Sequence, residues 1–286
     1  MSSVQPELVS VLAWPSAWSR QRIAEVLVES LGIDPADARL LAASPAPMVA
    51  GVLDRAPAAD ALRVLRDRRV AAVCVPMSHM QARTPPLTAK RLTQAIDAPE
   101  PLYMVEPWRG EGRGLRMRDV VLMVRGRIAR FTRTTTFDST FDHDDGRAGA
   151  HSAFDLGAVT ELRGGRDDAL DLYALSGPPV RITGRFDFGS VLGRERGYSD
   201  GENMDRLALR LAEQAPGAEI DLDYSSFKAA PGLSRALRST LSVTGTSTTV
   251  KRDDTPMFDF YSAWKAVIHV RLREWRAGQS SSSPKT

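Results

Sequence analysis

The stretch Leu115–Arg133 reads LRMRDVVLMVRGRIARFTR, and its apolar residues fill two runs on either side of Arg125-Gly126. Beyond Pro107 the apolar residues recur with a period of two, which is typical of strands that bury one face. A glycine between two such runs is a common hairpin signal. The stretch therefore predicts two antiparallel strands joined by a hairpin or a tight bend at Arg125-Gly126.

A second pair of strands and a helix follow this stretch. ALDLYALS (169–176) and VRITGRFDF (180–188) are separated by the turn sequence GPP (177–179). The next residues predict an amphipathic helix that Ser199 or Asp200 caps. The apolar stripe of this helix consists of Met204, Leu207, Ala208 and Leu211. Antiparallel strands closed by such a helix are typical of an α+β roll.

The region 102–224 resembles a bacterial pleckstrin-homology-like domain in its apolar strand, its PPVRI and RFDF sequences and its closing helix. The resemblance implies an antiparallel β-roll. Many barrels of this type bind proteins or have no known ligand, so the resemblance does not favour phosphoinositide binding.

An acidic segment, FDSTFDHDDG (137–146), lies between the two strand pairs. An EF-hand calcium loop needs oxygen ligands at alternate positions, then a glycine and a distal glutamate. Asp142 and Asp144 alternate, but Gly146 takes the place of the third acid, and no glutamate stands at the distal position. We therefore interpret the segment as a solvated acidic loop.

Metal binding by this loop stays open as an alternative. A zinc site would draw on two histidines and a nearby aspartate, although their spacing follows neither a helix nor a hairpin. The weak metal candidates are Asp142, His143, Asp144 and His151. The corresponding function is a metal-dependent hydrolase based on the segment 138–155, with Asp138, Asp142, His143 and Asp144 as its functional residues.

Arginines are concentrated in and around the first strand pair. On alternating strands some of them share a face and could contact phosphates. The candidates for anion or nucleic-acid contacts are Arg116, Arg118, Arg125 and Arg127. The pattern lacks the interleaved aromatic and glycine residues of an RNA-recognition strand, so we favour a solvated sheet face.

The first 77 residues predict a small α/β unit. VSVLAWP (9–15) predicts a strand, and apolar residues at helical spacing follow it up to Gly32, a predicted C-cap. Asp34-Pro35 predicts the start of a second helix, because aspartate caps helices and proline suits their first position. A short edge strand, a third helix and a buried strand complete the order β-α-α-β-α-β.

Two runs of this unit, LGIDPADARLLAASPAPMVAGV (31–52) and DALRVLRDRRVAAVCV (60–75), resemble the C-terminal domain of the bacterial ribosomal stalk protein. That fold is shared with the ClpS adaptor of the Clp protease. The resemblance implies contacts with translation factors through lysines on the first two helices, and Arg39 takes the place of one of them. However, Asp34-Pro35 replaces the expected Gly-Leu, and AWPSAWS (13–19) replaces the acidic loop with which ClpS holds its substrate. Neither activity is therefore expected here.

Two tryptophans follow the first strand of this unit. Trp14 and Trp18, together with Arg39, form a candidate partner surface. Alternatively, the tryptophans cover the end of their own core, which is the more common role of such residues.

The remaining segments are a predicted linker and a helical C-terminal region. Prolines bracket the segment 78–100, which predicts a linker or docking segment with a short helix from Thr88 to Ile96. The last helix is predicted to begin at Thr255-Pro256. Its apolar stripe consists of Phe258, Tyr261, Trp264, Ile268, Leu272 and Trp275. We expect this stripe to pack over a domain, with a dimer interface or a membrane-surface helix as alternatives, and we expect His269 to be packed rather than catalytic.

The composition is typical of a globular protein of one to three domains. The formal net charge of +3 is small, and the scarcity of lysine beside arginine is typical of a GC-rich bacterial genome. The single cysteine, Cys74, predicts a core thiol in a reducing cytoplasm. No run approaches the roughly 18 apolar residues of a membrane span, and the N-terminus lacks a secretory signal.

These observations predict an α+β protein in five parts. They are a βααβαβ domain over residues 7–77, a linker or docking segment over 78–100, an antiparallel β-roll closed by a helix over 101–225, helices over 226–277 and a disordered tail over 278–286. We expect no catalytic residue and no cofactor, because the dinucleotide, P-loop and nucleophile-elbow motifs are lacking. The favoured function is that of a cytoplasmic bacterial interaction or adaptor protein that binds a protein partner.

Overall fold

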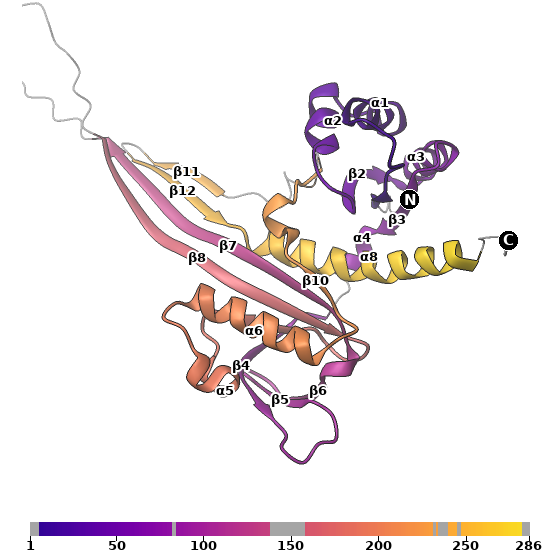
Figure 1. The fold of residues 1–286 in the computed structure, drawn as a ribbon. Helices are drawn as coiled ribbons and strands as arrows, with labels where there is room; N and C mark the ends of the chain where they lie inside the picture. Colours follow the sequence, from indigo (N-terminus) through magenta and orange to yellow (C-terminus); the bar gives the residue numbers. More distant parts are fainter. Residues whose placement is uncertain are drawn as a thin grey trace, which may run out of the picture.

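A computed structural model describes residues 6–81, 84–137, 158–230, 233, 240–244 and 247–281. It is a mixed α/β structure in which two separate β-sheets lie on either side of the long C-terminal helix α8 (Figure 1). Among the described residues, no helix combines the length and the apolar content that are needed to cross a membrane.

The first sheet and its helices are formed by residues 6–76. The order of the sheet is β2-β1-β3, and both pairings are antiparallel. The elements are β1 (Pro6–Ala13), α1 (Arg20–Leu31), α2 (Pro35–Ala42), β2 (Met48–Asp54), α3 (Arg55–Asp67) and β3 (Ala71–Pro76). One face of this sheet packs against the three helices, and the other packs against α8.

The helix ends in this region follow from local sequence. Gly32 ends α1 with a φ of 64°, a left-handed conformation that glycine adopts without a steric penalty. The side chain of Asp34 accepts a hydrogen bond from the backbone N–H of Ala36 and caps α2, whose first residue is Pro35. Both predicted caps are confirmed.

The second sheet contains nine strands within the described residues. Its main order is β11-β12-β7-β8-β9-β4-β5-β6, and β10 pairs with β7. The strands are β4 (Leu87–Gln94), β5 (Leu102–Pro107), β6 (Arg113–Arg116), β7 (Val120–Phe137), β8 (Ala158–Ala174), β9 (Val180–Thr183), β10 (Glu219–Asp221), β11 (Thr240–Thr244) and β12 (Ser247–Asp253). Other helices and 3-10 turns are α4 (Met77–Gln81), η1 (Met117–Asp119), α5 (Gly189–Leu192), η2 (Gly193–Glu195), α6 (Asp200–Gln214), η3 (Asp223–Ser226) and α8 (Thr255–Ser281).

The predicted hairpin at Arg125-Gly126 is wrong, because β7 runs without interruption from Val120 to Phe137. The antiparallel partner of β7 is β8, which begins only at Ala158. Gly126 allows a close helix contact instead of a turn. A Cβ atom at Gly126 would lie 2.5 Å from two ring carbons of Phe258 in α8, so only glycine lets this helix pack so closely on the strand.

The predicted helix from Thr88 to Ile96 is also wrong, because residues 87–94 form β4. A β-bulge shifts the register of β4 between Ala89 and Arg91. As a result, Ala89 and Leu92 both point into the core although they are three residues apart, a spacing that imitates a helix in the sequence.

The second sheet is mixed rather than wholly antiparallel. β4 pairs with β9 in parallel, and so does β10 with β7. Two strands, β11 and β12, lie where only helices were expected within 226–277, and α8 extends to Ser281, beyond the expected start of the tail. The predicted turn at 177–179 is confirmed, since β8 and β9 are joined there and Gly177 has a φ of 79°.

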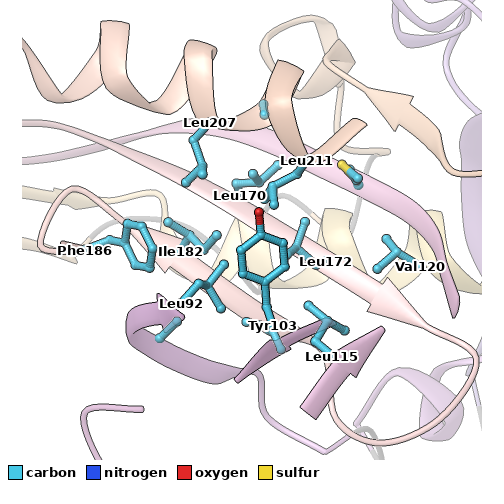
Figure 2. Close-up of a cluster of buried hydrophobic side chains, with 14 of the residues drawn as sticks. Leu92, Tyr103, Leu115, Val120, Leu170, Leu172, Ile182, Phe186, Leu207 and Leu211 are labelled. Carbon is cyan, nitrogen blue, oxygen red and sulfur yellow. The ribbon is translucent and has the colours of Figure 1, made fainter. Parts of the chain in front are cut away.

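One core lies between the curled part of the second sheet and α6. Tyr103 lies at its centre, and Leu207 and Leu211 of α6 point toward Leu170 of β8 (Figure 2). Ser199 caps α6 by accepting a hydrogen bond from the backbone N–H of Glu202. The predicted apolar stripe of α6 is confirmed, because all four of its residues are buried.

A second core is built around α8 and is shared by both sheets. Leu8 and Val75 of the first sheet and Val124 of the second sheet belong to the same cluster as Trp264. The indole Nε1 of Trp264 donates a hydrogen bond of 3.0 Å to Ser10 Oγ in β1. Five of the six residues of the aromatic stripe of α8 are buried and Trp275 is half-buried, so the stripe packs inside the chain, as expected.

Candidate functional site

The most unusual group of polar side chains lies between α8 and the second sheet. Arg181 of β9 and Asp171 of β8 are cross-strand partners and therefore point to the same face of the sheet. The guanidinium of Arg181 donates to both carboxylate oxygens of Asp171, at 2.7 and 2.8 Å. Asp171 is fully buried, and Arg181 is only 8% exposed. Such a bidentate pair is the strongest arrangement of these two groups.

Helix α8 completes this group with two polar residues. Asp259 accepts a hydrogen bond from Nη1 of Arg181, and the hydroxyl of Ser262 donates to Asp171 at 2.5 Å. The hydroxyls of Ser262 and Tyr173 are 2.9 Å apart. The buried carboxylate of Asp171 thus accepts from several donors, which offsets the free-energy cost of removing its charge from water.

The electrostatics keep Arg181 charged. Burial lowers the pKa of its guanidinium, but the hydrogen bonds and charges of Asp171 and Asp259 outweigh burial and raise that pKa above its ordinary value. The guanidinium carbon also lies 5.1 Å from the ring centre of Phe258. Arg181 is therefore held as a charged side chain between two carboxylates, and it borders a cavity.

The cavity, which we call the Arg181 cleft, has a volume of about 640 Å³. Its lining comes from β4, β7, β8 and β9 and from the first residues of α6 and α8. Four arginines and three aspartates line it, a formal excess of one positive charge: Arg109, Arg130, Arg181, Arg185, Asp167, Asp168 and Asp200. Trp108, which is 50% exposed, forms part of the wall.

Two of the acids in the Arg181 cleft already have basic partners. Asp168 pairs with Arg125 at 3.2 Å, and Asp167 pairs with Arg130 at 3.2 Å. In contrast, Arg109 and Arg185 are exposed and form no ion pair with any acid of the described residues. Asp200, which also lines the cleft, is exposed and forms no ion pair within the described residues either, so the unpaired side chains of the cleft carry a formal excess of one positive charge.

Arg181 also lines a second cavity of about 420 Å³ on the side of Tyr173 and Asp259. Because the Arg181 side chain borders both cavities, its ion pairs with Asp171 and Asp259 help to separate them. A change in these pairs would alter the shape of both.

A second row of polar contacts lies further along α8. Lys265 forms an ion pair with Asp221 of β10, and the hydroxyl of Tyr261 donates to Asp221 at 2.7 Å. His269 Nδ1 lies 3.2 Å from a carboxylate oxygen of Glu219, while its buried Nε2 has no hydrogen-bond partner among the described residues. Burial lowers the pKa of His269. The histidine is packed, as predicted.

The candidate partner surface in the first region is only partly assembled. Trp14 and Trp18 lie together, with ring centres 6.1 Å apart, and pack against the core of the first sheet. Arg39 is exposed on α2, and its Nε donates to the backbone oxygen of Pro35 in the same helix. The tryptophans thus cover the end of their own core, and their use as a partner surface stays a prediction.

The four candidate arginines do not gather on one surface. Arg118 pairs with Glu100, and Arg125 pairs with Asp168 and Asp205. Arg127 lies 3.5 Å from Asp168, and Arg116 is exposed on β6. Three of the four are therefore balanced by acids of this chain, and a role in nucleic-acid binding stays a prediction.

The candidate metal ligands Asp142, His143, Asp144 and His151 lie outside the described residues, as does the rest of the segment 138–157. Within the part that the structure describes, no group of three or more His, Cys, Asp or Glu residues is suited to hold a metal ion. The metal hypothesis stays a prediction.

Sequence reasoning missed the residues at the base of the Arg181 cleft. A signal was present, since Asp171 and Arg181 are charged residues inside the two apolar strands on either side of the predicted turn. Two opposite charges in neighbouring buried strands indicate a buried ion pair. The contribution of Asp259 and Ser262 had no comparable signal.

Comparisons with protein-family models, with curated proteins and with solved structures give no match for this chain.

Proposed function

We propose that this chain is a non-enzymatic interaction protein that holds an acidic segment of a partner protein in the Arg181 cleft. The observation that carries the proposal is the pair of rim arginines, Arg109 and Arg185, which have no acidic partner among the described residues. Guanidinium groups bind carboxylates in a planar, two-pronged geometry, so such a pair favours acidic side chains.

The base and the wall of the cleft suit the same role. Arg181 is held in place by Asp171 and Asp259, whose carboxylates offset its charge, so the base of the cleft is fixed and the unpaired positive charges lie at the rim. Trp108 presents a half-exposed ring beside Arg109. Aromatic residues and arginines are enriched among the residues that dominate binding energy at protein interfaces. A volume of about 640 Å³ has room for several side chains.

The proposal includes the finer fold assignments. The order of elements from β1 to β3 supports a stalk-protein-like or ClpS-like fold for residues 7–77. The antiparallel neighbours β7, β8 and β9 and the closing helix α6 support a pleckstrin-homology-like β-roll, from which the parallel pair β4–β9 departs. An interaction role in the bacterial cytoplasm is in keeping with both resemblances.

The test is a comparison of two double variants with the same change in charge. Arg109→Glu/Arg185→Glu reverses the rim charges, whereas Arg194→Glu/Arg196→Glu reverses two exposed arginines outside the lining of the cleft. Tagged chains are recovered from the cells in which the protein occurs naturally, and bound proteins are quantified by mass spectrometry. We expect a partner that the wild type and the second variant retain and that the first loses by about tenfold or more.

Equal recovery of every bound protein by the two double variants would overturn the proposal. The alternative ligand of the rim arginines is nucleic acid. If a fluorescent single-stranded oligonucleotide binds the wild type and not the rim variant, and no protein partner depends on the rim, the cleft binds phosphates instead.

A further inference from the structure

The strand β3 leaves one edge of the first sheet open. Within the described residues β3 pairs only with β1, from Glu7↔Pro76 to Ala13↔Ala71, and forms the end of the order β2-β1-β3. An edge strand presents backbone N–H and C=O groups that can pair with another extended chain. Proteins usually cover such an edge or place charges or proline on it. Ala71 to Val75 carry no charge, and the proline of β3, Pro76, stands only at the end of the strand.

A groove of about 630 Å³ lies along this edge. Its base consists of residues 70–74 at the start of β3, together with Leu12 of the neighbouring strand. One wall comes from α3 and the other from α8: Leu62, Arg66, Arg271, Glu274 and Trp275. The open edge thus lies between two helices that belong to different cores.

The side chains of β3 explain why the groove has these two walls. Ala72 and Cys74 belong to the core that faces α1 to α3, whereas Ala71 and Val73 pack on the core around α8. A chain added beside β3 would continue this alternation. Its side chains would point in turn toward α3 and toward α8, and both walls offer apolar contact through Leu62 and Trp275.

We propose that an extended segment of a partner protein adds to β3 as a fourth strand of the first sheet. The segment carries apolar side chains at alternate positions, which pack on Leu62 and Trp275, and an acidic side chain that faces Arg66. In this mode of recognition, backbone hydrogen bonds supply affinity and the alternate side-chain contacts supply specificity. The proposal goes beyond the Arg181 cleft and gives the chain a second binding surface.

Charge supports the acidic residue in the partner segment. Arg66 is exposed on α3 and forms no ion pair with an acid of the described residues. On the opposite wall Arg271 is balanced by Glu274 at 3.0 Å. The unbalanced charge of the groove therefore comes from the α3 wall, and it is positive.

The shape of the groove favours a single extended chain over a second copy of this protein. The edge of β3 lies between the walls that α3 and α8 provide. In a pair of copies joined edge to edge, each β3 would bring its own α3 and α8 against those of the other copy. A lone extended segment meets no such obstruction.

The probe is a phage-displayed library of random nine-residue peptides, selected on the full chain. Two variants of α3 serve as the comparison: Arg66→Glu reverses the charge in the groove, and Arg63→Glu reverses an exposed arginine that contacts Asp60 and Asp67 instead. We expect enriched peptides with alternating apolar residues and at least one acid. Arg66→Glu should weaken their binding by about tenfold, and Arg63→Glu should leave it nearly unchanged.

Hydrogen exchange locates the bound peptide. We expect slower exchange of backbone amides within 71–75 when the strongest peptide is present, and no change at β9. If no peptide is enriched, if Arg66→Glu binds the peptides as well as the wild type does, or if protection appears elsewhere, the proposal is overturned.

Other binding sites for the peptides, and other occupants of the groove, would give different experimental results. Peptides that depend on Arg109 and Arg185 but not on Arg66 bind the Arg181 cleft, which supports the proposed function and overturns the inference about β3. A chain shortened after Ser281 that gains about tenfold in peptide affinity shows that its own last residues occupy the groove. A dimer in sedimentation experiments that Arg66→Glu dissociates shows that a second copy occupies the groove, which overturns the proposal of a partner segment.

Discussion

Helix α8 contacts the two sheets in different ways. Toward the second sheet it presents polar residues that meet charged partners, as Asp259 meets Arg181 and Lys265 meets Asp221. Toward the first sheet its contacts are apolar, and the hydrogen bond from Trp264 to Ser10 is the one polar side-chain contact between α8 and β1 in the described residues. An ion pair between a helix and a sheet forms at only one position of the helix, whereas an apolar contact tolerates small shifts of the helix.

This difference indicates that α8 is positioned by the second sheet and that the first sheet packs on the surface that remains. It also separates the two proposed binding surfaces. The Arg181 cleft lies beside the polar contacts, and the groove along β3 lies beside the apolar ones.

The largest effect is expected from Arg181→Ala. The substitution leaves the buried carboxylate of Asp171 without its bidentate partner, which should lower the free energy of unfolding by about 3–5 kcal/mol. Urea unfolding followed by circular dichroism measures it. Arg185→Ala, which removes an exposed arginine of the same cleft, should change stability by less than about 0.5 kcal/mol. Similar losses for both variants would show that the buried pair does not hold α8 on the second sheet.

A smaller effect is expected from Gly126→Ala. The added methyl group would lie 2.5 Å from ring carbons of Phe258 and 2.8 Å from the ring of Tyr224, so the rings or the helix must shift, at a cost of about 1–3 kcal/mol. Gly165→Ala on the neighbouring strand β8 is the matched control, because nothing lies within 4 Å of the added atom. Thermal unfolding of both variants measures the difference in their stability. If Gly126→Ala is as stable as Gly165→Ala, the close packing of α8 on β7 is not required.

The contact with the first sheet is tested by Ser10→Ala. Trp264 loses the acceptor of its buried indole N–H, which should lower stability by about 1 kcal/mol. We also expect faster hydrogen exchange in β1, β2 and β3 and little change in β7 and β8. Ser30→Ala, which removes a hydroxyl that donates a hydrogen bond within its own helix, should leave the stability and the hydrogen exchange of the first sheet unchanged. Faster exchange throughout the chain after Ser10→Ala would contradict a separate alignment of the two sheets.

The smallest effect is a dependence of stability on pH through His269. Burial lowers its pKa in the folded chain below the ordinary value of 6.5, against the opposing effect of Glu219. The unfolded chain therefore takes up this proton first as the pH falls. The contribution of His269 to stability is complete above pH 6.5 and declines as the pH falls through 6.5 toward the lowered pKa.

The measurement for His269 is the urea midpoint between pH 7.5 and 5.5. His269→Gln should reduce the decline relative to the wild type, and His79→Gln, at an exposed histidine of α4, should not. An unchanged decline in His269→Gln would assign the pH dependence to other groups.

The features that sequence reasoning predicted are those that depend on near neighbours. The caps at Gly32 and Asp34 and the start of α8 depend on residues within one helical turn. The apolar stripe of α6 repeats at intervals of three and four residues, which only a helix places on one face. These elements could be identified without knowing what they pack against.

The errors have a common cause in distant contacts. The bulge in β4 changes which residues face inward, and its position depends on the pairing with β5. Gly126 imitates a turn signal, yet it serves the approach of Phe258, a residue far away in the sequence. In both cases a local pattern had two explanations, and the neighbouring element decided between them.

The sequence by itself determined the caps at Gly32 and Asp34, the start of α8 and the buried faces of α6 and α8, because these follow from interactions over a few residues. Only the tertiary structure decided the register of β8 on β9 and the position of α8 on both. That register brings Asp171, Arg181 and Ser262 together, although 91 residues separate the first from the last. Hydrogen bonds between such distant residues form only after the chain has folded, because no local pattern specifies which buried charges will meet.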